Sequence, residues 1–489
     1  MKVVLISTYE LGHQPFGLAS PAAWLRRDGA EVTCLDLSRQ PLREDAVRAA
    51  DVVAFYVPMH TATRLAIRLI EPIRRLNPGA HLCFYGLYAP VNEQYLRELG
   101  VEIITGGEFE SVLTTSVKRL AGAENGNGAP TIAFPASGTR NSSIVLDRLQ
   151  FLLPDRTHLP PLRQYAHLLM PEGGFRVAGY TEASRGCKHL CRHCPIVPVY
   201  NGIFRIVQRE VVLEDIRQQV AAGAEHISFG DPDFFNGPAH AIAIVEAMHR
   251  EFPQLSYDVT IKIEHLLKHA DSLRKLRDTG CLFVISAVES IDDSILARLA
   301  KGHTRADFLA VVALFRELSL TLQPTFVPFT PWSSLSGYCE LLAVLADEDL
   351  VENVAPIQLG IRLLIPAGSR LLELEDLRNA IGDFDSSGLV YPWRHTDARM
   401  DSLSERVQEL ANAGDRLKRS RTDTFLRICQ AASDLAGERP IPHAAAARHS
   451  ARQVPHFTEP WYCCAEPTQD QFVSITSDTR APAQSDTFF

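Results

Sequence analysis

The sequence predicts an α/β protein with a doubly wound parallel sheet, then a partial or full β/α barrel, then a helical, weakly ordered tail. Short apolar runs alternate with amphipathic helices in residues 1–120 and again in residues 175–368, as in parallel sheets covered by helices. A stretch rich in Gly, Asn and Ala at 121–145 separates the two series. A chain of 489 residues is also too long for one core. We therefore expect an N-terminal domain, a linker, the barrel, C-terminal helices and a tail at 1–120, 121–160, 161–398, 399–436 and 437–489.

The first series is predicted to hold five buried strands, at Val3–Ser7, Glu31–Leu37, Asp51–Tyr56, His81–Tyr85 and Val101–Thr105. Its helices are expected at Ala19–Arg27, at Thr61–Leu76 and from the glycine pair 106–107 to Lys118. Ligands of such sheets bind at the carboxyl ends of the strands. The loop Thr8–Gly17 and the turn Gly106, Gly107 and Glu108 lie there, although the two glycines could equally serve only a tight turn.

The second series is predicted to hold six strands, at Arg176–Tyr180, His226–Phe229, Ser256–Ile261, Leu282–Val288, Thr321–Pro328 and Ile357–Leu364. Its helices are expected at Val212–Ala222, Ala239–Glu251, before Thr279, at Ala306–Leu318 and at Leu335–Leu345. Asp231 and Asp233 follow the second strand, and Glu289 follows the fourth. Strand ends meet at one mouth of a β/α barrel, so these acids are candidate ligand contacts, or else helix caps and turns.

Composition and charge indicate which partners to expect. The hydrophobic fraction of 46% and charged fraction of 22% are those of an ordinary soluble protein. A net charge of −9 gives no reason to expect nucleic-acid binding, and the basic run at 416–421 is expected to be a solvated helix face. No apolar stretch reaches the ~20 residues of a membrane span, and residues 1–8 resemble a strand more than a signal peptide. We therefore expect a cytoplasmic protein without nucleic-acid or membrane partners.

Three cysteines carry the strongest chemical signal. Cys187, Cys191 and Cys194 form a Cys-x3-Cys-x2-Cys pattern directly after the first barrel strand. Three thiolates on one loop can hold three corners of a cubane iron–sulfur cluster and leave the fourth iron open to a ligand. A zinc site is the alternative, and it needs a second pair of ligands. His189 and His193 within the loop, or the His-x3-His pair at 265 and 269 on a separate predicted helix, are the only nearby candidates.

This cysteine loop, at the start of a β/α series, resembles the loop of the radical SAM superfamily over roughly residues 175–368. The resemblance implies a 4Fe-4S cluster held by Cys187, Cys191 and Cys194, whose open iron binds S-adenosylmethionine (SAM). One-electron cleavage of SAM then yields a 5′-deoxyadenosyl radical that abstracts a substrate hydrogen. The segments 229–235 and 284–290 resemble the family's SAM-contacting strand ends, which implies SAM contacts by Gly230, Asp231, Ser286 and Glu289. His193 stands where most members have an aromatic residue.

The N-terminal domain resembles the cobalamin-binding domains of some radical SAM enzymes. Those domains often carry an Asp-x-His-x-x-Gly motif after the first strand. Here Glu10, His13 and Gly17 replace it, with the aspartate missing and one extra residue before the glycine. The resemblance implies cobalamin as a candidate cofactor, near Gly106, Gly107 and Glu108, and it does not require His13 as cobalt ligand, because many members of this class lack that histidine. The domain could instead only dock on the barrel.

The tail resembles that of the CUAEP/CCAEP-tail radical SAM proteins, at residues 461–467. There Cys463 and Cys464 stand side by side, at a position that carries Cys or selenocysteine in that group. A position that accepts either residue is expected to be reactive, as a vicinal disulfide, a dithiol redox pair or a soft-metal chelate. The alternative is two buried apolar side chains. The 25 residues before Cys464 are long enough to cross the barrel mouth.

These features predict a radical SAM enzyme that modifies a small molecule or a peptide. Cys463 and Cys464 would act as redox or adduct-forming partners, and a reductase such as flavodoxin or ferredoxin would supply electrons. Cobalamin-dependent methyl transfer is one alternative. A non-catalytic redox or soft-metal sensor and a zinc-stabilised module are alternatives of other classes.

Overall fold

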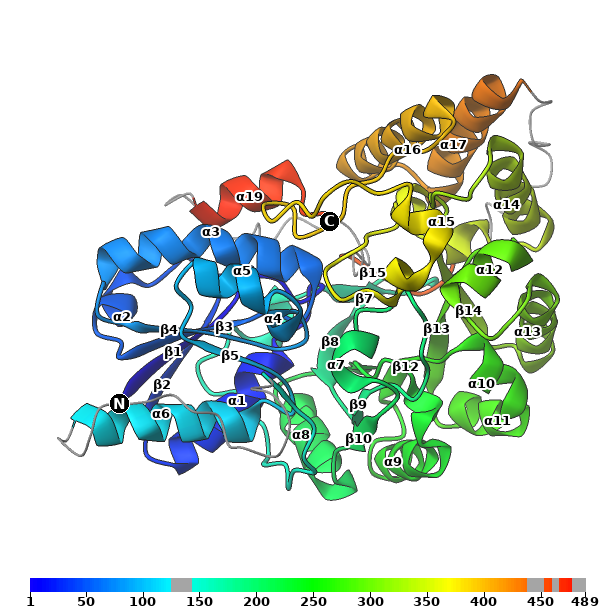
Figure 1. The fold of residues 1–489 in the computed structure, drawn as a ribbon. Coiled ribbons are helices and arrows are strands. Elements are labelled where there is room, and N and C mark those ends of the chain that lie inside the picture. The colour runs from blue at the N-terminus through cyan, green and yellow to red at the C-terminus, as the bar shows by residue number, and fades with distance from the viewer. Residues whose placement is uncertain (125–142, 438–452, 460–465, 477–489) are drawn as a thin grey trace.

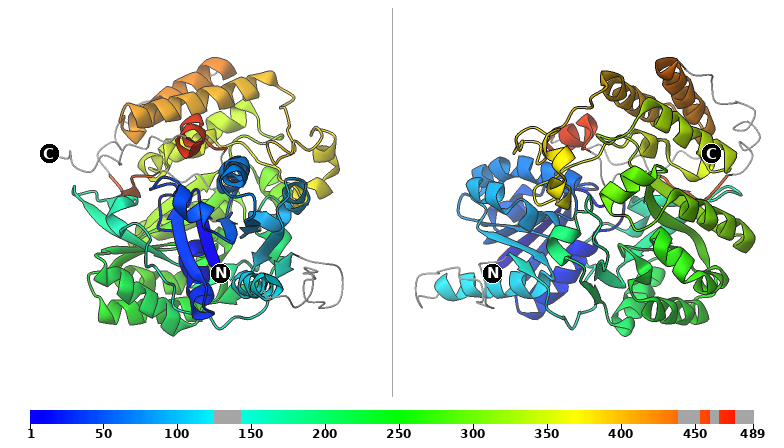
Figure 2. Two further views of the ribbon diagram at one scale, coloured as in Figure 1. Left: turned by 90° about the vertical axis from the view of Figure 1, so that its left-hand side faces the viewer. Right: turned by 45° about the vertical axis from the view of Figure 1, so that its right-hand side comes forward.

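The computed structural model describes residues 1–124, 143–437, 453–459 and 466–476. Figure 1 shows the N-terminal sheet domain beside the β/α barrel, with two long C-terminal helices lying across the barrel's end. Figure 2 shows the same arrangement from two further sides, with the last described helix against the N-terminal domain. The predicted fold class is confirmed.

The N-terminal domain is a six-stranded parallel sheet in the order β2-β1-β3-β4-β5-β6. Its strands are β1 (Lys2–Ser7), β2 (Glu31–Asp36), β3 (Val52–Tyr56), β4 (His81–Tyr85), β5 (Ile103–Gly107) and β6 (Ile144–Val145). Helices α1 (Phe16–Arg27) and α6 (Glu110–Glu124) bury one face of the sheet. The other face is covered by α2 (Glu44–Arg48), α3 (His60–Leu76), α4 (Tyr88–Val91) and α5 (Glu93–Glu98). Both faces are covered, which explains why the strands are continuous apolar runs.

Strand β6 lies in the segment expected as a linker. Ile144 and Val145 pair with Gly106 and Gly107 and extend the sheet by one strand. Further along the same segment, the guanidinium of Arg156 donates to both carboxylate oxygens of Asp215 on helix α8 (Arg209–Ala221), at 2.8 Å each. Residues 143–160 therefore join the two domains by packing and ion pairing as well as by chain connection.

The barrel is a curved seven-stranded sheet in the order β14-β13-β12-β11-β8-β7-β15. Its parallel strands are β8 (Phe175–Thr181), β11 (His226–Phe229), β12 (Ser256–Thr260), β13 (Cys281–Glu289) and β14 (Thr321–Phe326), and antiparallel β7 (His167–Leu169) and β15 (His456–Phe457) extend one edge. The helices around it are α8 (Arg209–Ala221), α9 (Pro238–Glu251), α10 (Ile263–Lys268), α11 (Ala270–Asp278), α12 (Asp293–Leu299), α13 (Arg305–Leu318) and α14 (Leu335–Asp347). The two edge strands β14 and β15 do not pair, so the barrel is partial.

The prediction of a strand at Ile357–Leu364 is wrong. The chain forms the 3-10 turn η4 (Pro356–Gly360), and only Arg362 bridges to Phe329 beyond the end of β14. Pro356 has no N–H to donate to a neighbouring strand. The carbonyl of Gly360 accepts from the side chain of Gln408 at 3.0 Å instead of from a strand. The apolar side chains of this segment are buried by packing without strand pairing.

The C-terminal helices α16 (Ala398–Arg416) and α17 (Arg421–Ala436) agree with the prediction for 399–436. Asp397 caps the first and Ser420 the second, by accepting from a backbone N–H in the first turn. Of the tail, β15 joins the barrel sheet and α19 (Gln469–Thr476) lies on α3 of the N-terminal domain. The remaining short elements are η1 (Leu162–Gln164), β9 (Ser184–Gly186), α7 (Val197–Tyr200), β10 (Phe204–Ile206), η2 (Phe234–Asn236), η3 (Val351–Asn353), η5 (Arg370–Glu373) and α15 (Glu375–Arg378).

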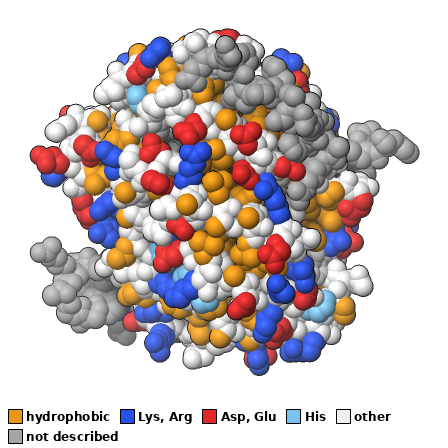
Figure 3. All heavy atoms as spheres, turned by 90° about the vertical axis from the view of Figure 1, so that its right-hand side faces the viewer, with side chains coloured by type: hydrophobic (Ala, Val, Ile, Leu, Met, Phe, Trp, Pro, Cys, Tyr) orange, Lys and Arg blue, Asp and Glu red, His pale blue; other side chains and the backbone are white. Residues whose placement is uncertain are grey.

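The outer face of the barrel carries both signs of charge. Figure 3 shows acidic and basic side chains interspersed with apolar ones on this side, without a large field of one sign. Within the described part of the chain, none of the helices combines the length and apolar character that crossing a membrane requires.

Candidate functional site

The cysteine loop leaves the barrel through a sharp turn at Gly186. This residue has φ +73°, and a Cβ there would lie 2.4 Å from the ring of Tyr200 and 2.5 Å from the carbonyl oxygen of Ile203. Only glycine fits such a position. The short antiparallel pair β9 and β10 holds the start of the loop, and α7 follows its end. The fold therefore fixes both ends of the segment that carries the three cysteines.

The structure brings Cys187, Cys191 and Cys194 together. Cys191 is buried, the other two are partly buried, and none forms a disulfide. Burial raises the pKa of Cys187 to about 11 and raises the pKa of Cys194 further, and the neighbouring thiols add to both shifts. These thiols resist ionisation when no cation is near, and a bound metal group would favour their thiolate forms. The three cysteines therefore suit a metal site.

The spacing of these sulfur atoms bears on the zinc alternative. Among the described residues, the one group of three or more His, Cys, Asp or Glu ligand atoms within 4.8 Å of one another is His189, Asp233 and His265. The three cysteine sulfurs do not form such a group. A single tetrahedral zinc ion needs its ligands closer together, whereas a cubane cluster separates its thiolates.

Gly230 and Asp231 tie the end of β11 to the strand that precedes the cysteine loop. A Cβ on Gly230 would lie 1.8 Å from the hydroxyl oxygen of Tyr180 on β8, so the two strand ends require glycine here. Asp231 accepts from the hydroxyl of Ser184 at 2.5 Å and from the backbone N–H of Ala183 at 2.9 Å. Burial raises the pKa of Asp231 to about 7.

Glu289 ends β13 at the other side of the mouth, in a left-handed backbone conformation with φ +69°. Its Oε1 lies 3.1 Å from Nε2 of His193 and 3.4 Å from Nζ of Lys301. Burial alone would raise the pKa of Glu289, but Lys301 and His193 lower it to about 2. Glu289 is therefore an anion, and it contacts His193, the residue directly before Cys194.

Ser286 and His303 are buried polar groups with unused hydrogen-bonding atoms. The hydroxyl of Ser286, on β13, and both ring nitrogens of His303 have no hydrogen-bond partner among the described residues. Burial lowers the pKa of His303 to about 4, so its ring is neutral. Buried polar atoms of this kind ordinarily find a partner, so they are suited to a bound molecule.

The sequence analysis missed Lys301, His303 and Lys262. The first two lie in the loop between α12 and α13, where Gly302 has φ +75°, and Lys262 precedes α10. All three are at least nine-tenths buried. The one sequence signal is the Lys-Gly-His run at 301–303, whose charged and imidazole groups flank a turn glycine beside an apolar helix.

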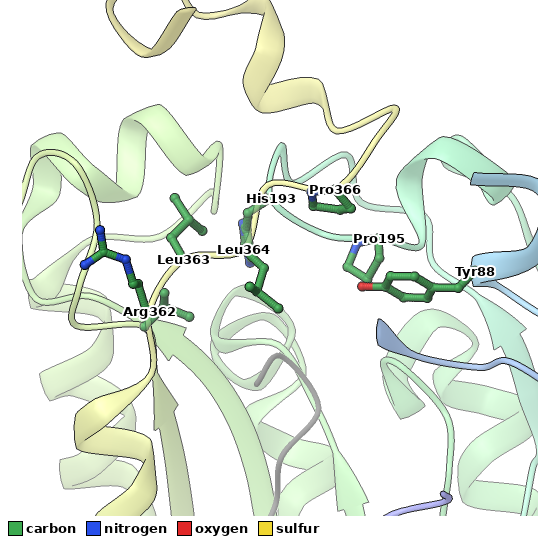
Figure 4. A pocket seen from close by; sticks show the side chains of 8 residues that line it. Tyr88, His193, Pro195, Arg362, Leu363, Leu364 and Pro366 are labelled. Atoms are coloured by element: carbon green, nitrogen blue, oxygen red, sulfur yellow. The ribbon is translucent and has the colours of Figure 1, made fainter. Parts of the chain in front are cut away.

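A small pocket opens next to His193, between the two domains. Figure 4 shows Tyr88 entering from the N-terminal domain beside Pro195, with Leu364 and Pro366 on the opposite segment. Arg362 borders the pocket, with its guanidinium paired to Asp401 at 2.7 Å and stacked on Trp393. The pocket is mostly apolar, with His193, Arg362 and the Tyr88 hydroxyl as its polar groups.

The turn of Gly106, Gly107 and Glu108 is packed by the protein itself. A Cβ on Gly106 would lie 2.6 Å from Pro90, and one on Gly107 would lie 2.1 Å from the carbonyl oxygen of Val145. Glu108 accepts from the hydroxyl of Tyr200 at 3.1 Å. These contacts match the tight-turn alternative for the two glycines.

His13 lies inside the contact between the domains. Its ring stacks on Tyr180 at 4.9 Å between ring centroids and meets Phe457 of the tail edge-on at 5.3 Å. Burial lowers the pKa of His13 to about 4. The residue packs against the barrel as a neutral aromatic group.

Cys463 and Cys464 lie outside the described residues. The described segments on either side are held by the N-terminal domain. Glu459 pairs with Arg39 at 2.9 Å, and Glu466 pairs with Nε2 of the buried His60 at 3.0 Å and with Arg64. The tail is therefore anchored on both sides of the cysteine pair.

Comparison with known proteins agrees with this geometry. Residues 181–334 match the radical SAM superfamily. The hopanoid C-3 methylase of Methylococcus capsulatus is 24% identical over 326 residues, which are 65% of this chain and 62% of the methylase. The chain thus spans less than two thirds of that relative's length.

Two solved structures share the fold over most of the chain. The cobalamin-dependent SAM radical enzyme OxsB matches with a TM-score of 0.62 and 15% identity, over 84% of this chain and 67% of OxsB. The radical SAM methyltransferase TsrM from Kitasatospora setae matches with a TM-score of 0.60 and 17% identity, over 77% and 76%. The family match implies a 4Fe-4S cluster and SAM as cofactors. Residues 181–334 therefore match a radical SAM core, and the chain shares its fold with OxsB and TsrM.

Proposed function

We propose that Cys187, Cys191 and Cys194 hold the 4Fe-4S cluster and that SAM lies between it and the ends of β11 and β13. The observation that carries this proposal is the meeting of three thiols on one loop with strand-end polar groups at one mouth of the barrel. When both are bound, the cluster would cleave SAM reductively and so supply a 5′-deoxyadenosyl radical. The protein's own residues shape the mouth, set its charge and exclude water.

Four residues would contact SAM, each for a different physical reason. Gly230 and Asp231 fix the close approach of β8 and β11, which forms the floor of the mouth. Ser286 has a hydroxyl free to bond a polar atom of SAM. Glu289 supplies a buried negative charge, which favours the sulfonium and ammonium groups of SAM.

The substrate would be a small molecule or a peptide side chain that enters the pocket beside His193. The pocket's apolar lining favours a largely apolar group, and Arg362 and Tyr88 offer polar atoms at its border. The placement of Tyr88 means that both domains would contact the substrate. A flavodoxin or ferredoxin would supply the electron from outside the chain.

Cys463 and Cys464 would act as a redox or adduct-forming pair. The paired acids Glu459 and Glu466 support this proposal, because they anchor the tail on both sides of the cysteines, one at Arg39 after β2 and the other at the first turns of α3. Replacing Cys463 or Cys464 by Ala would abolish substrate turnover and leave SAM cleavage intact. Unchanged turnover in both variants would exclude the role.

Cobalamin-dependent methyl transfer is the second candidate. The six-stranded parallel sheet and the fold likeness to OxsB and TsrM favour it. His13 and the 106–108 turn are already packed by protein, so cobalamin would have to bind at other parts of the sheet edge. One cobalamin per chain after anaerobic purification with added cobalamin would support this function, and no retained cobalamin would exclude it.

The decisive experiment for the main proposal is anaerobic reconstitution with iron and sulfide, followed by assay of 5′-deoxyadenosine and methionine. Wild-type protein is expected to bind four irons with sulfide and to release both products. Cys187→Ala, Cys191→Ala and Cys194→Ala should each lose the cluster, whereas Cys429→Ala, a buried thiol on α17, should keep it. A cluster without SAM cleavage would favour a redox or soft-metal sensor, and zinc without iron or sulfide would favour a structural module.

A further inference from the structure

A second cluster of metal-ligating side chains lies beside the cysteine loop. His189 comes from the loop itself, Asp233 from the segment after β11, and His265 from α10. Asp233 is 1% exposed and His265 is 2% exposed, and the side chain of His189 is 14% exposed. Three elements far apart in the sequence therefore place two imidazoles and one carboxylate at one buried point.

The distances match the ligands of one small cation. Nε2 of His189 lies 3.3 Å from Nε2 of His265 and 3.5 Å from Oδ2 of Asp233. Ligands about 2.0–2.1 Å from a tetrahedral ion lie about 3.3 Å from one another. Nδ1 of His265 approaches the same Oδ2 more closely, at 2.6 Å.

The orientation of the closest pair is a second, independent observation. Although Oδ2 of Asp233 and Nδ1 of His265 are 2.6 Å apart, neither atom has a hydrogen bond of acceptable geometry to the other or to any other described residue. Both atoms are buried. Two buried polar atoms this close without a hydrogen bond are open to a partner that lies beside them, and a cation would serve as that partner.

We propose that His189, Asp233 and His265 form a mononuclear divalent-metal site, separate from the cysteine cluster. Two imidazole nitrogens and one carboxylate oxygen suit zinc or ferrous iron and leave a position open. The proposal does not depend on the proposed reaction. The ion would link the cysteine loop to α10 and to the end of β11, which gives it a role in holding the loop.

The charges around His189 set the condition for binding. Its Nδ1 lies 3.2 Å from the ammonium of Lys262 and 3.6 Å from the carboxylate of Glu264, and these two groups pair with each other at 3.1 Å. A metal on Nε2 requires the proton to reside on Nδ1. As the side chains stand, Nδ1 accepts from the Lys262 ammonium at 3.2 Å, so metal binding would require this ammonium to turn away and Nδ1 to donate to Glu264, as metal-bound histidines ordinarily do to a carboxylate. Lys262 and Glu264 cancel in charge, and Asp233 leaves the site one net negative charge.

The test uses the full chain with Cys187, Cys191 and Cys194 all changed to Ala, so that no cluster can form. Cobalt(II) alone is the probe, followed by absorption spectroscopy and by thermal unfolding with and without the metal. One cobalt per chain is expected, with a spectrum lacking a sulfur-to-metal charge-transfer band and with a higher unfolding temperature. His265→Ala and Asp233→Asn in this background should lose both effects, and circular dichroism checks that each variant is folded.

His269→Ala is the matched control. His269 lies beside α10, its ring contacts that of His265 edge-on at 5.8 Å, and it is outside the three-residue group. This variant should bind cobalt as the parent does. Equal binding by the His265→Ala variant, or no nitrogen- and oxygen-bound cobalt in the parent, would overturn the proposal and leave only the contacts that Lys262, His189, His265 and Asp233 make with one another.

Discussion

The guanidinium of Arg185 donates two hydrogen bonds to the carboxylate of Glu110, at 2.9 and 2.7 Å, across the contact between the domains. Arg185 lies two residues before Cys187, and Glu110 begins α6 of the N-terminal domain. Both side chains are buried, and Glu182 also accepts from Arg185 at 2.6 Å. The position of the cysteine loop is thereby coupled to the N-terminal domain.

Glu110→Ala should destabilise the domain contact by about 3–5 kcal/mol, because it leaves a buried arginine with fewer partners. Denaturant unfolding, with iron content measured on the same samples, checks this expectation. Thr115→Ala, on the exposed side of the same helix, should change stability by less than about 0.5 kcal/mol. Equal behaviour of the two variants would mean that the ion pair does not stabilise the contact.

Glu108 predicts a pH dependence of stability. Burial raises the pKa of Glu108 to about 7, although the nearby Arg185 acts in the opposite direction. Between pH 4.5 and 7, the carboxyl of Glu108 therefore keeps its proton in the folded protein and loses it in the unfolded chain. A raised carboxyl pKa favours the folded state at low pH, and this advantage is lost as pH rises from about 4.5 to 7. Glu108→Gln removes the ionisation and should be more stable than wild type at pH 8, by on the order of 3 kcal/mol. At pH 5 the two proteins should unfold almost alike.

Thermal unfolding from pH 5 to 8 measures this difference. Glu98→Gln, on the exposed surface of α5, is the control and should track wild type at every pH. A Glu108→Gln variant that also tracks wild type would show that Glu108 ionises normally in the folded protein.

Ser286 is expected to contribute to SAM binding. Its buried hydroxyl has no partner among the described residues, and one net hydrogen bond is worth roughly 0.5–1.5 kcal/mol. Ser286→Ala should therefore weaken SAM binding by roughly 2- to 12-fold while iron and sulfide content stay unchanged. Equilibrium binding of SAM to the reconstituted protein tests this, with exposed Ser402→Ala as control. Wild-type affinity in the Ser286→Ala variant would place SAM elsewhere.

The pair Arg64 and Glu466 allows a charge-swap test of tail docking. Arg64→Glu should release α19 from α3, because it sets two negative charges against each other beside the buried His60. Limited proteolysis should then cut faster within residues 466–476. The double variant Arg64→Glu with Glu466→Arg should recover part of the protection. No change in cleavage with the single variant would show that the apolar contacts of α19 suffice to dock the tail.

The sequence predicted the parallel strands well because each is a short buried apolar run between turn residues. Ile357–Leu364 has the same apolar character, but it is buried by later parts of the chain, Leu359 with α16 and Ile361 and Leu363 with residues 365–393. Strand β6 was missed because two residues carry no periodic signal, and they pair only where β5 offers an edge.

The site was predicted where one short motif carries it and missed where the fold assembles it. The cysteine spacing is local, so the triplet was found. Lys301 and His303 become part of the mouth only after α12 turns the chain back toward Glu289. Likewise, His265 was weighed with His269 as a zinc pair, whereas the structure places it with His189 and Asp233.

The pairing of β15 with β7 has a consequence for how the chain is made. His167 and Thr458 bond to each other across 291 residues, so the edge of β7 stays open on the ribosome until residue 458 has emerged. An unpaired strand edge is open to pairing with other chains, and contacts this distant in sequence form slowly. A chain truncated before residue 453 would keep every cysteine of the triplet and still expose this edge. We expect such a product of incomplete synthesis to aggregate, so that only finished chains accumulate in a form that can receive a cluster.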